Sequence, residues 1–262
     1  MFEATFSQPP GPPWKRYVLP GSALEATGSS WRLINQASDA QRYTDAQIDD
    51  YQGLRRRDLH WKPPLTLTVR ARFSHPAGEL VGTAGFGFWN DPFVMTAGTA
   101  RPALPRAIWF FYASPDSDMK LDLETPGHGW KAATMDASRL PFLLLAPTAP
   151  LAVPLMNIRP LYRALWPVGQ RAIGVREALI DAPMTEWHTY ELRWEVGRAI
   201  FRVDDQTVLA ADTSPRGPLG FVMWIDNQAM VATPWGRFAY RLLPIPRPQW
   251  MEVAVLRIAD GG

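Results

Sequence analysis

Two aspartates follow tryptophans at the same short spacing, in Trp89-x-Asp91 and in Trp224-x-Asp226. Side chains alternate between the two faces of a β-strand, so each Trp and Asp pair is expected on one face. Two carboxyl groups in an apolar cleft can differ in pKa, so that one serves as an acid and the other as a base. Asp91 and Asp226 are therefore the candidate catalytic residues if the protein is an enzyme. The sequence does not set the distance between them.

The same strand faces carry further groups that could hold a small ligand. Flat aromatic rings stack on sugars and also pack against extended apolar molecules, while carboxylate and amide groups bind hydroxyl groups through hydrogen bonds. The predicted ligand site consists of Trp89, Trp109, Trp224 and Gln228, with Gln47 and Asp49 at its rim. The alternative is a buried polar network that braces an aromatic-rich sheet and binds nothing.

Strand parity separates the expected core from the expected cleft. In segment 85–91, Phe86 and Phe88 share the core face, whereas Gly85 and Gly87 share the other face with Trp89. Glycine inside a strand often marks close approach by another group, so both glycines are expected to clear space for a ligand. In segment 221–228 the apolar set expected in the core is Phe221, Met223 and Ile225.

Three blocks of sequence occur in an order typical of one fold. They are LTLTVRAR at 65–72 with GTAGFGFWNDP at 82–92, WHTYELRW at 187–194 with FRVDDQ at 201–206, and PLGFVMWIDN at 218–227. The first block resembles the paired strands that precede the catalytic strand in family 16 glycoside hydrolases, and the third resembles a late strand that lines the same cleft. The second resembles a hairpin common in the concanavalin A-like lectin and glucanase superfamily, to which that family belongs. This resemblance implies an antiparallel jelly-roll β-sandwich and says little about activity.

Segment 104–113, LPRAIWFFYA, falls where a laminarinase-like member of that family would have its catalytic strand. The retaining mechanism of the family needs a nucleophile and an acid/base carboxylate about 5 Å apart. Neither face of this strand offers Asp or Glu, because the alternating sets are Ala107, Trp109 and Phe111, and Ile108, Phe110 and Tyr112. We therefore predict that the protein lacks family 16 glycosidase activity.

Composition is typical of many short strands joined by turns, with 26 Pro, 19 Gly and 12 Trp in 262 residues. We predict one all-β domain over residues 1–262. Short extended pieces are expected near 15–19 and 31–35, and a strand with one polar face at 43–51. Further strands are expected near 65–73, 81–90, 106–113, 128–134, 187–195, 199–204, 206–211, 217–227, 235–242 and 250–258.

Residues 136–173 interrupt this pattern. The stretch 140–158, LPFLLLAPTAPLAVPLMNI, has no charged residue, but its four prolines remove backbone donors and argue against a membrane-spanning helix. We predict a mainly helical apolar insertion. Its role is open between an auxiliary core, a lid over an apolar ligand and, for residues 140–166, a patch that contacts a membrane surface.

Other features narrow the class of protein. The chain has no cysteine and a net charge of +2, so disulfides, thiolate nucleophiles and nucleic-acid partners are not expected. No metal or phosphate motif is present, and no cofactor is expected. The N-terminus lacks a secretory pattern, which predicts a cytoplasmic location.

The sequence leaves two functions open. We favour binding of a carbohydrate or an extended apolar molecule in an aromatic-lined cleft, without chemistry. The alternative is acid/base catalysis on an apolar substrate, such as isomerisation, cyclisation or hydration, with Asp91 or Asp226 transferring the proton.

Overall fold

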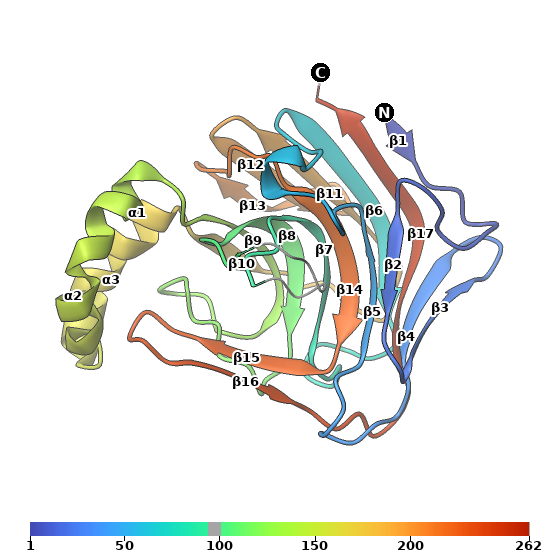
Figure 1. Cartoon of the computed structure of the whole chain (residues 1–262), viewed down its shortest axis with the longest axis horizontal. Helices are drawn as coiled ribbons and strands as arrows, with labels where there is room; N and C mark the ends of the chain where they lie inside the picture. The colour runs from blue at the N-terminus through green and yellow to red at the C-terminus, as the bar shows by residue number, and fades with distance from the viewer. Residues whose placement is uncertain (94–100, 262) are drawn as a thin grey trace.

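The computed structural model describes residues 1–93 and 101–261, and these form two large antiparallel sheets (Figure 1). One sheet has the strand order β13 (Gln206–Ala211), β12 (Arg198–Val203), β11 (His188–Glu195), β6 (Leu65–Phe73), β17 (Gln249–Asp260), β4 (Trp31–Asn35) and β3 (Ser22–Ala26), with β1 (Phe2–Glu3) paired to β17. The other has the order β10 (Arg176–Leu179), β9 (Gly129–Asp136), β8 (Arg106–Ala113), β7 (Thr83–Trp89), β14 (Gly220–Asp226), β5 (Asp45–Asp49) and β2 (Lys15–Val18).

The two sheets enclose an aromatic core that holds the second sheet in place. Phe86 of β7 and Phe110 of β8 lie 5.3 and 5.2 Å from the ring of Tyr190 in β11. Phe88 lies 5.4 Å from Trp194 in the same strand. Tilted and edge-to-face pairs at these distances are favourable beyond simple burial. The inner faces of β7 and β8 are therefore fixed, and their outer faces are free to build a site.

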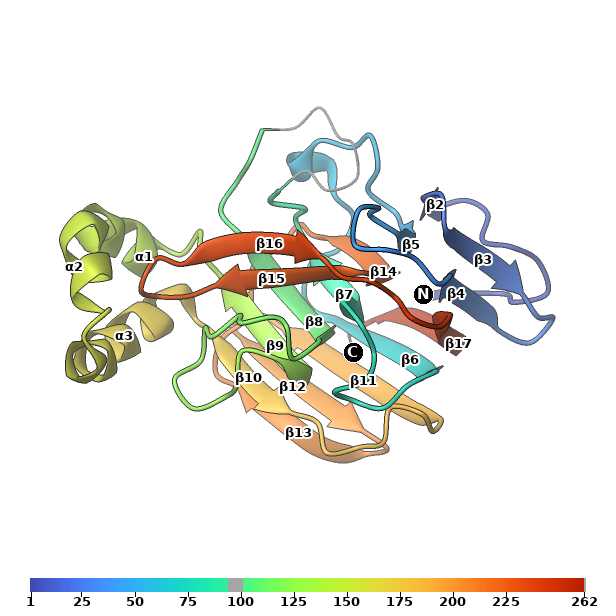
Figure 2. The same cartoon turned by 90° about the horizontal axis from the view of Figure 1, so that it is seen from below.

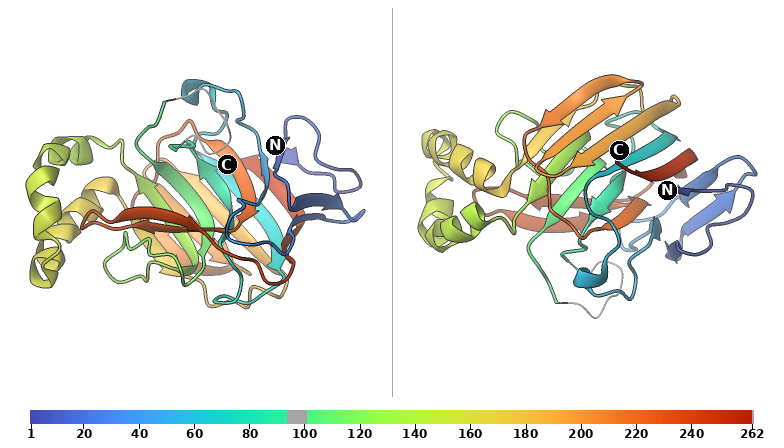
Figure 3. Two further views of the ribbon diagram at one scale, coloured as in Figure 1. Left: turned by 60° about the horizontal axis from the view of Figure 1, so that its bottom comes forward. Right: turned by 90° about the horizontal axis from the view of Figure 1, so that it is seen from above.

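A hairpin and a helical insertion complete the fold. The hairpin β15 (Gln228–Ala232) and β16 (Phe238–Leu242) follows β14 directly and extends toward the helices (Figure 2). The insertion contains α1 (Leu140–Leu145), α2 (Ala149–Leu155) and α3 (Arg159–Ile173), with the short 3-10 helix η2 (Ala146–Thr148) between the first two. A further 3-10 helix, η1, spans Arg56–Asp58. The helices and the N-terminal strands lie at opposite ends of the molecule (Figure 3).

The predicted all-β sandwich with a mainly helical insertion is confirmed. The expected strands at 65–73, 106–113 and 206–211 coincide with β6, β8 and β13, respectively. Buried and more exposed residues alternate along β6, which is the local pattern that predicts a strand. The sequence did not indicate β3 or β10. Each of these lies at the edge of its sheet and pairs with one neighbour, so its side chains do not alternate cleanly between core and solvent.

Candidate functional site

A cavity of about 350 Å³ lies on the face of the second sheet that points away from the sandwich core. Strands β5, β14, β7 and β8 provide its floor, and the hairpin β15–β16 and the loop 114–128 add side chains to its walls. The predicted parity is confirmed, because Phe221, Met223 and Ile225 are in the core whereas Trp224 and Asp226 line the cavity.

The register of β7 with its neighbours β14 and β8 explains how large aromatic rings fit on the cavity face of the sheet. Gly85 pairs with Trp224 on one side and with Phe111 on the other. A Cβ atom on Gly85 would stand 3.1 Å from the Trp224 ring, and one on Gly87 would stand 2.5 Å from Cα of Trp109. The glycines therefore clear space for neighbouring tryptophans. The prediction that they clear space for a ligand beside Trp89 is wrong.

The aromatic floor is one continuous cluster. The ring of Trp109 lies 5.7 Å from Trp89, 5.4 Å from Trp224 and 5.3 Å from Phe111, with which it is stacked. Two indoles are also fixed by hydrogen bonds, since Trp89 Nε1 donates to Tyr51 Oη at 2.8 Å and Trp224 Nε1 donates to Thr83 Oγ1 at 2.9 Å. The floor is thus preorganised for an apolar surface.

Asp226 lies at one end of the cavity and is held by donors from two strands. Its Oδ1 accepts hydrogen bonds from Thr83 N at 3.0 Å, Thr83 Oγ1 at 2.9 Å and Gln228 N at 3.0 Å. Burial raises the pKa of Asp226 to about 6, and these hydrogen bonds limit the rise. The carboxyl group can therefore change its charge near neutral pH while its orientation stays fixed.

Asp45 and Tyr43 belong to the same end of the cavity, and the sequence analysis did not place them in the site. Asp45 is the register partner of Asp226. Tyr43 Oη lies 3.4 Å from Oδ2 of each carboxyl group. Burial, and then the charge of Asp226, raise the pKa of Asp45 well above its usual range. The one available signal was that Asp45 shares a strand face with Gln47.

Gln47 and Asp49 have different surroundings. Gln47 and Gln228 line the cavity, as expected. Asp49 is fully buried and is not among the lining residues. Its carboxylate accepts hydrogen bonds from Gln47 Nε2, Gln52 Nε2, and the backbone N–H groups of Tyr51 and Gln52. The rim position predicted for Asp49 is wrong, and its geometry is that of a bracing polar network.

Asp91 lies outside the cavity. Strand β7 ends at Trp89, and Asp91 has a φ of 40°, so the alternation that was extrapolated to residue 91 does not reach it. Arg56 Nη2 donates to the backbone oxygen of Asp91 at 2.7 Å. Because Asp91 is absent from the lining, the prediction that it shares one cleft with Asp226 is corrected.

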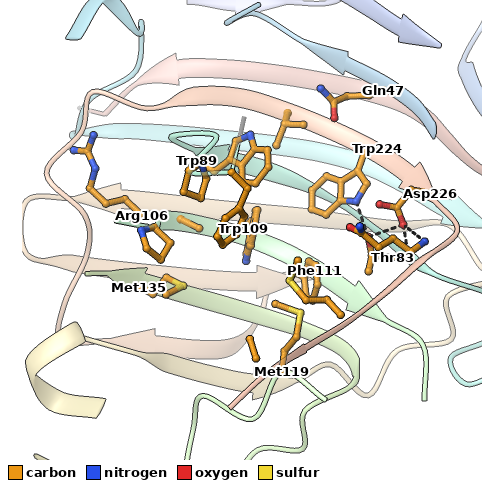
Figure 4. A pocket seen from close by; sticks show the side chains of 18 of the residues that line it. Gln47, Thr83, Trp89, Arg106, Trp109, Phe111, Met119, Met135, Trp224 and Asp226 are labelled. Carbon is orange, nitrogen blue, oxygen red and sulfur yellow. Dashed lines mark hydrogen bonds between the residues drawn. The ribbon is translucent and has the colours of Figure 1, made fainter. Parts of the chain in front are cut away.

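Arg106 marks the other end of the cavity, opposite Asp226, with the tryptophans between them (Figure 4). Its guanidinium donates to the backbone oxygens of Gly217 at 3.2 Å and Pro218 at 3.5 Å. Burial lowers the pKa of Arg106. Apolar walls lie between the two ends and include Met119, Leu121, Met135 and Met230, none of which was predicted from the sequence.

No protein-family model matches the chain, and no curated protein matches it in sequence. Among solved structures, a β-glucanase of Bacillus licheniformis aligns with a TM-score of 0.54 at 10% identity, covering 99% of this chain and 98% of that chain. An endo-β-galactosidase from Clostridium perfringens that releases GlcNAcα1-4Gal gives 0.52 at 13% identity, covering 98% and 62%. A pseudo β-1,3-glucanase of Mycobacterium tuberculosis gives 0.50 at 11% identity, covering 100% and 99%. The chain has the concanavalin A-like fold of the β-glucanases. At such low identity the likeness shows the fold alone.

On this glucanase-type sandwich, β8 points Trp109 and Phe111 into the cavity and buries Phe110 in the core. The cavity face of β8 therefore has no carboxylate, as expected from the sequence. Among the described lining residues, the carboxyl groups are those of Asp45 on β5 and Asp226 on β14. The family resemblance implies catalytic carboxylates on a different strand, β8.

The helical insertion encloses a second cavity, of about 650 Å³, against the hairpin. The two cavities adjoin, because they share wall residues Pro105, Leu121, Met135, Ala232 and Phe238. Helices α1 and α2 bury none of their own residues, and only Trp166, Gly169, Ala172 and Ile173 of α3 are buried. Within the described ranges, no helix is long and apolar enough to cross a membrane.

Proposed function

We propose that the protein binds an extended apolar small molecule in the cavity above β5, β14, β7 and β8. The observation that carries this proposal is the distribution of groups along the walls. Aromatic rings and methionines occupy the middle, and titratable groups occupy the ends at Asp226 and Arg106. A ligand that covers the middle removes apolar surface from water, which stabilises the complex by about 25 cal/mol per Å².

Carbohydrate is the ligand class that the glucanase-type fold suggests. Sugar rings do stack on tryptophan, but each buried hydroxyl group also needs a hydrogen-bond partner. The middle of this cavity is lined by residues such as Trp109, Phe111, Met119 and Val222, which offer few such partners. An apolar molecule therefore fits the walls better than a sugar.

Acid/base catalysis on the bound molecule is the second candidate function. The observation that favours it is the pairing of Asp45 with Asp226 at one end of the cavity. Two neighbouring carboxyl groups with raised pKa values can supply an acid and a base near neutral pH. The reaction would be an isomerisation, cyclisation or hydration. Asp91 has no part in it, because Asp91 does not line the cavity.

The test is to identify what the protein retains. Protein purified without detergent would be extracted with organic solvent, and the extract analysed by mass spectrometry. We expect an apolar compound in the wild type and its depletion from Trp109→Ala. Trp187→Ala is the matched control, since Trp187 packs on Arg70 and Arg72, outside the cavity.

Recovery of a sugar from the wild type would contradict the apolar ligand. Equal amounts of the compound from the wild type and from Trp109→Ala would contradict binding in this cavity. Catalysis would be detected as conversion of the recovered compound on incubation with fresh wild type, with loss of conversion in Asp226→Asn.

A further inference from the structure

The end of the cavity at Asp226 presents hydrogen-bond acceptors that are not satisfied. Asp45 is 3% exposed; its Oδ1 is buried without a partner among the described residues, and its Oδ2 has a long contact of 3.4 Å with Tyr43 Oη. Oδ2 of Asp226 has a long contact of 3.4 Å with Tyr43 Oη, whereas Oδ1 accepts three good hydrogen bonds. Buried acceptors without donors are costly. A group with several donors would satisfy this end of the cavity.

The charges of Asp45 and Asp226 also favour a ligand group with several hydrogen-bond donors. Within the described part of the chain, Asp45 and Asp226 form no ion pair with Lys, Arg or His. Two carboxyl groups that are register partners repel each other when both are ionised. A cation placed between them would relieve this repulsion.

We propose that this end of the cavity recognises a primary ammonium group on the bound apolar molecule. An ammonium group has three donors and no acceptor, which matches Oδ2 of Asp45, Oδ2 of Asp226 and Tyr43 Oη. The inference rests on the proposed function, because the apolar body of the ligand would occupy the aromatic floor. The ligand class is then a cationic amphiphile, with an apolar body and an amine at one end.

The test compares two probes of the same shape, phenylbutylamine and phenylbutanol, by isothermal titration at neutral pH. We expect the amine to bind at least tenfold more tightly than the alcohol. Asp226→Asn and Asp45→Asn should each remove most of this preference and leave the affinity for the alcohol nearly unchanged. Asp50→Asn is the control, since Asp50 is a buried carboxylate that contacts Trp61 and Phe221 and does not line the cavity.

Equal affinity of the two probes for the wild type would overturn ammonium recognition while leaving apolar binding intact. That comparison needs no variant, so misfolding of a variant cannot obscure it. If neither probe binds the wild type, the proposed function fails together with this inference. Retention of the amine preference in both Asp→Asn variants would also overturn the assignment to this end of the cavity.

The helical insertion supports a second inference, which is independent of the cavity. Four of its exposed apolar side chains line neither cavity, and we name them the insertion patch: Leu140, Leu143, Leu144 and Ile158. Leu140 and Leu144 are 66% and 71% exposed. Exposed apolar surface concentrated on one element marks an interaction surface.

The charges of the insertion indicate what covers it. No Asp or Glu occurs between Asp136 and Glu177, whereas this stretch contains five arginines. Arg159 and Arg163 are exposed and form no ion pair among the described residues. A symmetric contact with a second copy would bring these arginines toward each other. Anionic lipid headgroups would pair with them while the leucines enter the acyl boundary.

We infer that the insertion patch docks on the surface of an anionic membrane. The second cavity lies directly beneath the helices and adjoins the first, so docking would bring both apolar cavities close to the lipid. The protein would lie on the bilayer rather than cross it.

Flotation with phosphatidylcholine vesicles, with and without phosphatidylglycerol, tests this inference. We expect flotation with the anionic vesicles only, a several-fold decrease at high salt, and loss of flotation in the double variant Leu140→Glu/Leu144→Glu. Val196→Glu is the matched control, because Val196 is 76% exposed in the β11–β12 turn, outside the insertion. Absence of flotation in the wild type would overturn the inference, as would unchanged flotation in the double variant. A wild-type dimer that the double variant converts to a monomer would assign the patch to self-association.

Discussion

Asp45 and Asp226 lie directly opposite each other on the hydrogen-bonded strands β5 and β14, with both carboxyl groups on the cavity side of the sheet. Like-charged residues in such positions normally destabilise a sheet. The structure limits the cost by giving Asp226 three donors and by keeping Asp45 in an environment that favours its neutral form. Because both carboxyl groups have raised pKa values in the folded protein, the free energy of unfolding depends on pH.

The first prediction concerns that dependence. In the folded protein burial raises the pKa of Asp226 from 3.8 to about 6, so the folded state binds this proton more tightly than the unfolded state. The free energy of unfolding should therefore fall as pH rises from about 4 to about 6, and then level off. A shift of about two units corresponds to roughly 3 kcal/mol at most. Asp45 acts in the same direction.

Urea denaturation at pH 4.5 and pH 7.5 measures this effect. The wild type should be more stable at pH 4.5, and Asp226→Asn should show a smaller difference between the two conditions because residue 226 no longer titrates. A wild type that is more stable at pH 7.5 would show that other groups dominate the titration.

The second prediction is the absence of retaining β-glucanase activity. The cavity face of β8 presents Ala107, Trp109 and Phe111, and no pair of carboxylates about 5 Å apart is available on that strand. Incubation with laminarin, lichenan or agarose should release no reducing ends above the buffer blank, with a known β-glucanase as positive control. Hydrolysis at an ordinary glycosidase rate would contradict it.

The third prediction separates the insertion from the core. Leu143 and Leu144 are 46% and 71% exposed, so the double change to Ser should alter the free energy of unfolding by less than about 1 kcal/mol. Ile173 of α3 is buried, and Ile173→Ala should cost about 2–5 kcal/mol. Thermal and urea unfolding of both variants provide the comparison. A large loss in the Leu variant would indicate that the exposed leucines belong to an auxiliary core.

Local patterns were enough to predict much of this fold. The apolar and aromatic run at residues 106–113 predicted β8, and strand geometry predicted which of its residues share a face, because side-chain parity depends only on neighbouring residues. The pairing of Asp45 with Asp226 could not be predicted, since the register of strands far apart in sequence is set by the whole sheet. The sequence also did not indicate that β7 ends at Trp89. Asp91 was therefore assigned to a strand face that it does not reach.

Gly85 and Gly87 show a second limit of prediction from the sequence. Gly85 and Gly87 were correctly identified as positions of close approach, but the sequence does not say which group approaches. The register supplies the answer, because each glycine has a large aromatic residue beside it on the neighbouring strand. Space that seemed available to a ligand is filled by the rings of the floor.

The last prediction uses two glycines that precede β7. Gly78 and Gly82 have φ values of +96° and +85°, so alanine is strained at both positions by a similar amount. Around Gly78 an added Cβ would meet nothing within 4 Å, whereas at Gly82 it would stand 2.1 Å from the backbone oxygen of Asp226. Relief of that clash requires β7 and β14 to separate where Thr83 N donates to Asp226.

Gly78→Ala should therefore cost about 1 kcal/mol, and Gly82→Ala about 1–3 kcal/mol more, the usual cost of overpacking. The clash at Gly82 would displace the backbone of Asp226, so Gly82→Ala should also weaken binding of any ligand that contacts Asp226. Gly78→Ala should leave that binding unchanged. Urea unfolding and titration with phenylbutylamine measure the two effects. Equal stability of the two variants would mean that β14 does not pack against Gly82 as described, and the position of Asp226 at the end of the cavity would then be wrong as well.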